Sequence, residues 1–174
     1  MGQAIMYPGG GSNIKSIQRL SYNFAVGASD QTVTIATINL DTSVIRNVTL
    51  YPSNLNINAN EFATELKFNT ATEVNLRRGT GTTYSLLVRF DVIEYNNIKS
   101  IQTINFFTTN LTITKPISSV NVNKAELVYT NRIGLAATSI GSAFAGDITT
   151  DVLLSFAGRS GDAKDVAAFV IEYK

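Results

Sequence analysis

The sequence contains no cysteine, no histidine and no tryptophan among its 174 residues. Without cysteine the chain has no disulfide, no thiolate metal site and no cysteine nucleophile. Without histidine it lacks the commonest general base and the commonest metal ligand. Any catalysis would depend on carboxylates, lysine, tyrosine and hydroxyl groups. We therefore expect a protein that is not an enzyme and that holds neither a cofactor nor a metal.

A charge excess of either sign is also missing, because 14 lysines and arginines face 13 aspartates and glutamates. This balance predicts no binding to nucleic acid through bulk charge. No apolar run approaches the roughly 20 residues of a membrane span, and residues 1–13 lack the basic and apolar regions of a signal peptide. We expect no membrane association, and a soluble protein that acts where it is made or in an assembly formed there.

What the sequence does contain is a repeat. The hexapeptide Asn-Ile-Lys-Ser-Ile-Gln stands at residues 13–18 and again at 97–102, and Val-Ile-Glu-Tyr stands at 92–95 and again at 170–173. These paired openings and endings predict two similar units, residues 14–96 and 97–174, after an N-terminal arm at 1–13. A unit of this size has a marginal core, so we expect contacts between units or subunits to add stability. The short joint between the units predicts that they pack rigidly or end to end.

Both units have the pattern of antiparallel β-sandwiches. Alternating apolar and polar residues predict six strands in the first unit, at 14–26, 32–38, 44–51, 61–68, 72–78 and 82–95. In the second unit they predict strands at 98–107, 117–122, 125–132, 149–156 and 165–173, with 134–146 as the most divergent region. Glycines at 79–81 and 158–161 predict a tight closing hairpin in each unit. A helical turn at 60–67 is the less favoured alternative to a strand there. The fold class expected is all-β, with two tandem six-stranded sandwiches from an internal duplication.

The N-terminal arm has a short apolar stretch, Ile5, Met6 and Tyr7, followed by a proline and three glycines. This composition is typical of a flexible joint. We expect the three apolar residues to anchor the arm on a neighbouring subunit or partner. The alternative is that the arm folds back on its own unit.

The frame of each unit, an opening Ile-x-x-x-Gln at 14–18 and 98–102 and a last strand ending in Val-Ile-Glu-Tyr, resembles the small sandwich modules of bacteriophage virion structural proteins. It is similar also to the H-type lectin domain, a six-stranded sandwich that forms trimers and binds N-acetylgalactosamine at subunit interfaces. The sequence departs from this pattern in the last strand, where Asp91 and Ala168 stand near a position that often holds tryptophan. The resemblance implies the sandwich fold and a tendency to form trimers.

Candidate contact residues lie beside the two predicted closing turns. Arg77 and Arg78 precede the first turn, and Arg159 and Asp162 lie in the second. Loops at the end of a sandwich are a common place for binding, so these residues are candidates for contacts with a glycan or a partner protein. The competing interpretation is that they solvate a hairpin and discourage edge pairing.

Glu94 and Glu172 occupy matching positions before the last tyrosine of each unit. Two equivalent acids suggest a catalytic pair, but they belong to different units, whereas a glycosidase needs its carboxyls within roughly 5–10 Å. We expect instead that each accepts hydrogen bonds from the opening strand of its unit. A calcium site is a further alternative, but the spacing of the aspartates that would form it, Asp147, Asp151, Asp162 and Asp165, matches no known loop.

Together these features favour a structural component of a virus particle: a capsid decoration, fibre or tail protein that assembles in the host cytoplasm. It would oligomerise, with a trimer favoured, through apolar strand faces left over after each core is filled, and contact other virion proteins through its arm. The alternative is a carbohydrate-binding, lectin-like module or adhesin that recognises a host surface glycan.

Overall fold

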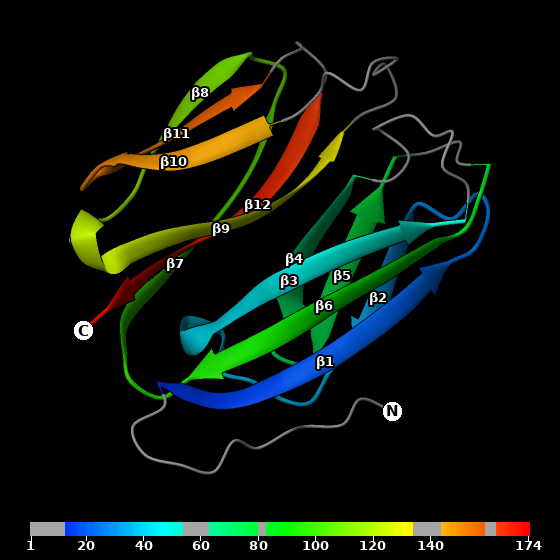
Figure 1. Cartoon of the computed structure of the whole chain (residues 1–174), viewed down its shortest axis with the longest axis horizontal. Coiled ribbons are helices and arrows are strands. Elements are labelled where there is room, and N and C mark those ends of the chain that lie inside the picture. The colour runs from blue at the N-terminus through cyan, green and yellow to red at the C-terminus, as the bar shows by residue number, and fades with distance from the viewer. Residues whose placement is uncertain (1–12, 54–62, 80–82, 134–143, 159–162) are drawn as a thin grey trace.

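The computed structural model describes residues 13–53, 63–79, 83–133, 144–158 and 163–174. Its regular elements are strands and two short 3-10 helices, so the all-β fold class is confirmed (Figure 1). The first unit contains β1 (Ile14–Phe24), β2 (Asp30–Thr34), η1 (Leu40–Thr42), β3 (Ser43–Pro52), β4 (Thr64–Thr70), β5 (Glu73–Arg78) and β6 (Leu86–Tyr95). The second contains β7 (Ile98–Thr108), β8 (Thr112–Pro116), η2 (Val122–Lys124), β9 (Ala125–Ile133), β10 (Phe144–Thr150), β11 (Leu153–Gly158) and β12 (Lys164–Tyr173).

Each unit is built from two three-stranded antiparallel sheets. In the first unit, sheet A has the order β1-β6-β3 and sheet B the order β2-β5-β4. In the second, sheet C has the order β7-β12-β9 and sheet D the order β10-β11-β8. Sheets A and C therefore have the same strand order, and so do sheets B and D, which is the arrangement expected of two similar sandwiches.

The predicted closing hairpins are wrong. β5 and β6 are the central strands of sheets B and A, and β11 and β12 are the central strands of sheets D and C. Their inward residues, Val74 and Leu76 from β5 with Val88 and Phe90 from β6, meet in one core from opposite sides. A tight hairpin would have placed both strands in one sheet, whereas β5 and β6 lie in different sheets, and so do β11 and β12. The short turns instead join β4 to β5 and β10 to β11.

Two predicted strands of the second unit also differ from the structure. The segment predicted at 117–122 follows β8 as a loop, in which the Ile117 and Val120 N–H groups donate to the carbonyls of Val152 and Asp151. The strand predicted at 149–156 is divided by a turn at those same two residues, 151–152, into β10 and β11. Of the predicted helical turn at 60–67, residues 64–67 are in β4, and none of the described residues 63–67 is helical.

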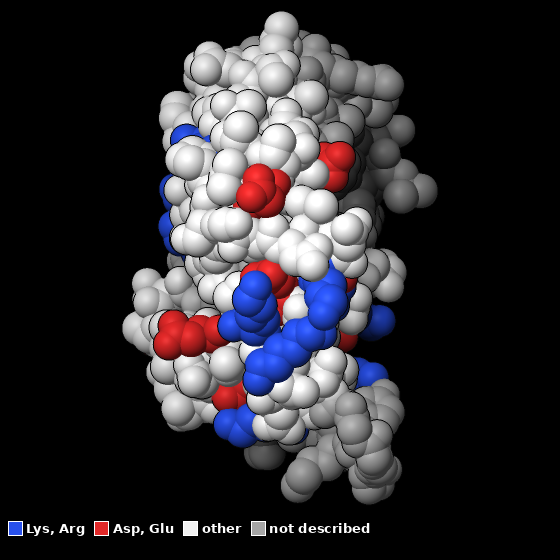
Figure 2. All heavy atoms as spheres, turned by 90° about the vertical axis from the view of Figure 1, so that its left-hand side faces the viewer, with Lys and Arg blue, Asp and Glu red and all other residues white. Residues whose placement is uncertain are grey.

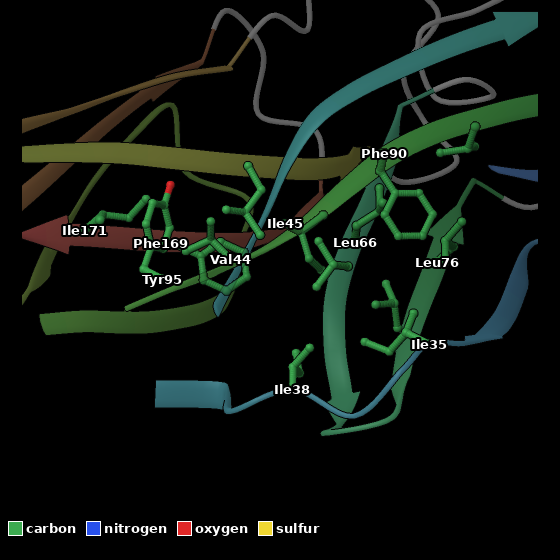
Figure 3. Packing of buried hydrophobic residues seen from close by; sticks show 14 of the residues in the cluster. Ile35, Ile38, Val44, Ile45, Leu66, Leu76, Phe90, Tyr95, Phe169 and Ile171 are labelled. Carbon is green, nitrogen blue, oxygen red and sulfur yellow. The ribbon is translucent and has the colours of Figure 1, made fainter. Parts of the chain in front are cut away.

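A single hydrophobic core joins the two units. Phe169 and Ile171 of β12 are buried in the same cluster as Val44, Leu66 and Tyr95 of the first unit (Figure 3). Alternate residues of β12 face the other way, into the core of the second unit, so β12, the central strand of sheet C, is buried on both faces. The predicted rigid packing of the units agrees with this shared core.

Edge-to-face aromatic contacts and side-chain hydrogen bonds close the joint between the units. The rings of Phe68 and Phe169 lie 5.7 Å apart, and the hydroxyl of Thr130 bonds both the N–H and the carbonyl of Leu66, at 2.9 and 3.1 Å. Leu66 lies on the open edge of sheet B, where β4 has no strand beyond it. The outer face of sheet C thus covers an edge of the first sandwich and satisfies its backbone groups.

Candidate functional site

Glu94 is the centre of a buried hydrogen-bond network at the end of β6. Its carboxylate accepts from Lys15 Nζ at 2.9 Å, from Ser16 Oγ at 3.4 Å and from the backbone N–H of Asn39 at 3.2 Å. The network ties the opening strand and the turn before β3 to the last strand of the unit.

Glu172 repeats this network in the second unit. It accepts from Lys99 Nζ at 2.8 Å, from Ser100 Oγ at 3.4 Å and from the N–H of Asn121 at 2.8 Å. These hydrogen bonds, led by the one from Lys99, lower the pKa of Glu172 below its usual value. The prediction that both glutamates accept hydrogen bonds from the opening strands is confirmed.

Arg78, predicted at the surface of a turn, is fully buried. Its guanidinium donates to the carbonyls of Ala28, Ala25 and Tyr84 and lies 4.9 Å from the ring centre of Phe24. The expectation of a surface position is therefore wrong, because this side chain satisfies carbonyls where the chain leaves the regular sheets. It is a structural residue of the first sandwich.

Arg77 is 30% exposed and lies between two carboxylates, with Nε 3.2 Å from Asp30 Oδ2 and Nη1 3.7 Å from Glu65 Oε2. The structure thus separates Arg77 from Arg78 by placing them on opposite faces of β5. The other predicted contact residues, Arg159 and Asp162, lie outside the described residues, as do Ile5, Met6 and Tyr7 of the arm.

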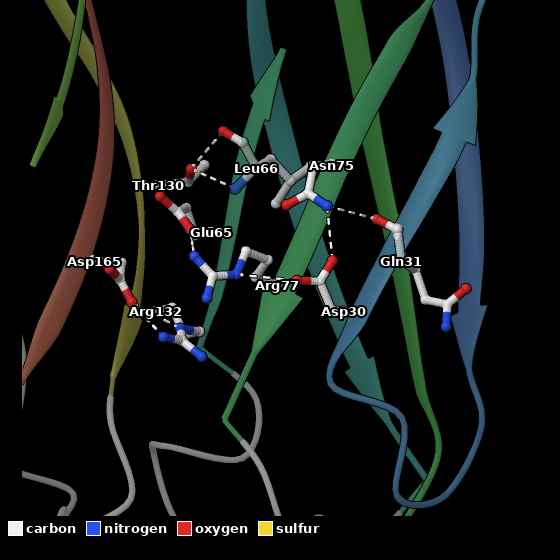
Figure 4. A network of polar contacts seen from close by, with 9 residues as sticks. All are labelled: Asp30, Gln31, Glu65, Leu66, Asn75, Arg77, Thr130, Arg132 and Asp165. Atoms are coloured by element: carbon white, nitrogen blue, oxygen red, sulfur yellow. Dashed lines mark hydrogen bonds and ion pairs between the residues drawn. The ribbon is translucent and has the colours of Figure 1, made fainter. Parts of the chain in front are cut away.

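Arg77 belongs to a polar cluster where the two units meet (Figure 4). Glu65 is buried in this cluster, and on the side of the second unit Arg132 donates to Asp165, with Nε 2.9 Å from Oδ2. Burial raises the pKa of Glu65 above its usual value, despite the neighbouring cations Lys67, Arg77 and Arg132. The ion pairs of this cluster lie within one unit or the other, and Arg132 and Asp165 of the second unit act on the charge of Glu65 across the joint.

The candidate binding site is a shallow hollow of about 310 Å³ on the outer face of sheet A, which lies in front of sheet B in Figure 1. We call it the sheet A hollow. It is lined by residues of the three strands of that sheet: Arg19, Leu20, Ser21, Asn47, Arg89, Phe90 and Asp91. Its volume is near the lower limit of ligand pockets.

A β-bulge in β3 shapes the sheet A hollow. Between Arg46 and Thr49 the strand advances three residues while β6 advances two, from Asp91 to Arg89. The bulge contains Asn47, whose φ of 53° lies in the left-handed region. No other described non-glycine residue has a positive φ. Asn47 Nδ2 donates to Asp91 Oδ2 at 2.8 Å. Bulges of this kind bend a strand and re-aim its side chains.

Two arginines flank the sheet A hollow. Arg19 is opposite Asp91 across the β1–β6 ladder, and Arg89 is opposite Ser21. Neither arginine takes part in an ion pair within the described part of the chain. Arg89 lies over the ring of Tyr51, 5.1 Å from its centre, and that tyrosine is 47% exposed.

In the second unit β9, which takes the place of β3, pairs with β12 without a register shift. The positions that match Arg89 and Asp91 are Ala167 and Phe169, which are buried against the first unit. The sequence did carry one signal of the difference, since Arg46 interrupts the apolar phase of its strand. Nothing in a single strand, however, indicates that three strands place polar side chains around one hollow.

The surface around the two glutamate networks carries charges of both signs. Figure 2 shows the end of the molecule at which β1 begins and β6 ends, where lysine or arginine side chains lie beside aspartate or glutamate. The exposed side chains of Lys15 and Lys99 both pair with buried glutamates. This end is thus mixed in charge and shows no broad patch of one sign.

Within the described residues, no three aspartate or glutamate side chains gather as metal ligands would, and no helix is long and apolar enough to cross a membrane. No protein-family model, curated protein or solved structure matches the chain.

Proposed function

We propose that this protein is a non-enzymatic structural component of a virus particle, a capsid decoration, fibre or tail protein. The observation that carries the proposal is the shared core, in which Phe169 and Ile171 of the second unit pack with residues of the first. Such a core makes the two sandwiches one rigid body, as a part that must hold its shape in a large assembly requires.

The joint between the units supports the same function. Only Asn96 and Asn97 separate β6 from β7, and the N–H of Asn96 donates to the carbonyl of Asn13 at 2.7 Å. This bond fixes the start of the first unit beside the start of the second. Asn13, where the described chain begins, is therefore held in place, and in this proposal Ile5, Met6 and Tyr7 contact a neighbouring virion protein.

Homo-oligomerisation, with a trimer favoured, is part of the proposal. The contact surface is not the part of the outer face of sheet C around Phe169, since the first unit covers that part. Phe107, near the end of β7, and Leu111, between β7 and β8, are 61% and 53% exposed and are better candidates. A lone exposed apolar pair is a small surface, so contacts made by the arm would contribute as well.

The test is incorporation into particles from the source of the sequence. The full chain should be recovered in purified particles at a regular copy number, and antibodies against the recombinant protein should label them. A variant lacking residues 1–11 should keep both folded units but stay outside the particles. Recovery of the full chain only outside particles would contradict the proposal, and normal incorporation of the truncated chain would contradict the role of the arm.

The second candidate function is recognition of a surface glycan by a lectin-like module. The sheet A hollow favours it, because hydrogen-bonding side chains and the exposed ring of Tyr51 lie on the same sheet face. A glycan array probed with the full chain tests it. Absence of any glycan signal would contradict this function and leave the structural role untouched.

A further inference from the structure

We propose that the sheet A hollow binds an acidic saccharide, a sugar that carries a carboxylate group. The inference deepens the glycan-binding candidate function and rests on it. It depends on four features of the hollow: its shape, its charge, its neutral hydrogen-bonding groups and its difference from the second unit.

The shape depends on a backbone conformation that L-residues rarely adopt. Asn47 has φ 53°, which costs roughly 1–2 kcal/mol for most residues and less for asparagine. The side chain of Asn47 then reaches across to Asp91 and leaves space between β1 and β3. A strained bulge beside a hollow is a common feature of binding sites.

The charge of the hollow favours an anion. Arg19 and Arg89 contribute two positive charges against the single negative charge of Asp91, which already accepts from Asn47. Guanidinium groups bind carboxylates through two parallel hydrogen bonds, a geometry that a planar carboxylate matches well. Both arginines are exposed, so their donors are accessible to a ligand.

The other groups favour a sugar over a simple anion. Ser21 and Asn47 both donate and accept hydrogen bonds, and Asp91 accepts from hydroxyl groups. Sulfate has no hydroxyl hydrogen to donate to Asp91, phosphate at neutral pH keeps fewer hydroxyls than a sugar, and Asp91 would repel the negative charge of either anion. A sugar acid offers hydroxyls to Asp91 and a carboxylate to an arginine, and the half-exposed Tyr51 lies next to the hollow with Arg89 over its ring.

The second unit shows that the fold does not require these polar residues. The matching positions in sheet C are Thr103, Asn105, Ala167 and Phe169, and the last two are buried against the first unit. At β12 this face is therefore buried, whereas at β6 the matching face is open and polar and lines the hollow. The pair Arg89 and Asp91 is a property of this face in the first unit alone.

The experiment is a calorimetric titration of the full chain with four probes: a uronic acid oligosaccharide, a neutral oligosaccharide of the same length, inorganic phosphate and a glutamate-rich peptide. The proposal predicts binding of the acidic oligosaccharide, with at least tenfold weaker binding of the other three. Arg89→Gln and Arg19→Gln should each weaken the binding of the acidic oligosaccharide by roughly tenfold or more. Lys124→Gln removes one charge from the exposed helix η2 and should change nothing.

Each contrary outcome has a distinct meaning. Equal binding of the neutral oligosaccharide overturns the acidic class but keeps the glycan-binding function. Equal binding of phosphate indicates a simple anion site. Equal binding of the peptide indicates a protein partner. Either result overturns the inference that the hollow binds a saccharide. No binding of the acidic oligosaccharide overturns the inference, and a glycan array without signal would remove the candidate function too. Thermal unfolding of each variant verifies that it is folded.

Discussion

Glu65 and Glu172 are both buried glutamates, and their surroundings move their pKa values in opposite directions. Glu172 accepts three hydrogen bonds that favour its charged form, whereas Glu65 has an oxygen, Oε2, that accepts no hydrogen bond from any described residue. A buried carboxylate is thus stabilising in one place and costly in the other.

Glu172→Gln should lower the free energy of unfolding at neutral pH by about 1–3 kcal/mol, because it weakens charge-assisted hydrogen bonds. The folded-state pKa lies below the ordinary value of 4.5, so the wild-type contribution is full above that value. It is lost as the pH falls below 4.5 through the lower, folded-state pKa. Urea unfolding of both proteins from neutral pH downward should therefore give curves that converge in acid. Curves that stay parallel would contradict this role of the charge.

Glu65→Gln should have the opposite pH dependence. The folded state holds its proton to a higher pH than the unfolded chain, whose glutamate titrates near 4.5. Wild-type stability should therefore fall as the pH rises from 4.5 through the raised pKa. The variant lacks this decline, so its stability relative to wild type should rise over the same window in urea unfolding. A stability difference that is independent of pH would contradict the raised pKa.

At the scale of elements, the decisive difference between the two units is in one strand. β3 and β9 occupy the same place in their sheets, but only β3 has the bulge at Asn47. β9 stays in register and lays Thr130 against Leu66 of the first unit. The two strands thus differ by one inserted residue. With it, β3 shapes the sheet A hollow, and without it, β9 contacts the first unit.

Asn47→Ala should lower the free energy of unfolding by about 1–2 kcal/mol, because alanine resists the left-handed conformation and loses the hydrogen bond to Asp91. Asn47→Gly is the matched variant: it loses the same hydrogen bond but accepts the backbone conformation. Chemical denaturation should therefore rank wild type first, glycine next and alanine last. A glycine variant less stable than the alanine variant would contradict the importance of the positive φ.

At the scale of the whole molecule, the contact between the units is heterologous, because it joins an edge of one sandwich to a face of the other. Such a contact would continue into a fibre if each unit had both surfaces free. Two features oppose this. The face of sheet A that matches the covered face of sheet C holds two charged residues, Arg89 and Asp91. The edge strand of the second unit that matches β4 is β10, and the N–H of its Gly146 already donates to Tyr129 Oη at 3.2 Å.

Replacing Arg89 by Ala and Asp91 by Phe in one chain would give sheet A the residues that sheet C has at these positions. The variant should associate further than wild type as concentration rises, because it exposes an apolar face that matches the edge of another copy. Analytical ultracentrifugation measures this. The control variant, Arg89→Lys with Asp91→Asn, keeps the face polar and should behave as wild type. An unchanged association state in the apolar variant would contradict this account.

Alternation and repetition in the sequence were enough to predict the all-β class, most strands of the first unit and the hydrogen bonds of Glu94 and Glu172. The strand pattern succeeds because the side chains of a sandwich strand alternate between core and solvent. The alternation of apolar and polar residues within one segment therefore indicates which residues are buried. The glutamates were predictable because the repeat pairs each of them with the same opening hexapeptide. The sheet A hollow was not predictable, since its residues come from three strands that are distant in sequence.

The sequence by itself therefore determined the all-β class, most strands of the first unit and that two similar units follow one another. Only the tertiary structure decided which strands share a sheet, that Arg78 is inside, and that one face of sheet C is buried while the matching face of sheet A is open. The physical reason is that local preferences set the conformation of a strand, whereas pairing and burial depend on segments far apart in the chain. A glycine-rich turn is compatible with a hairpin and with a crossing, and only the core between the two sheets selects the crossing here.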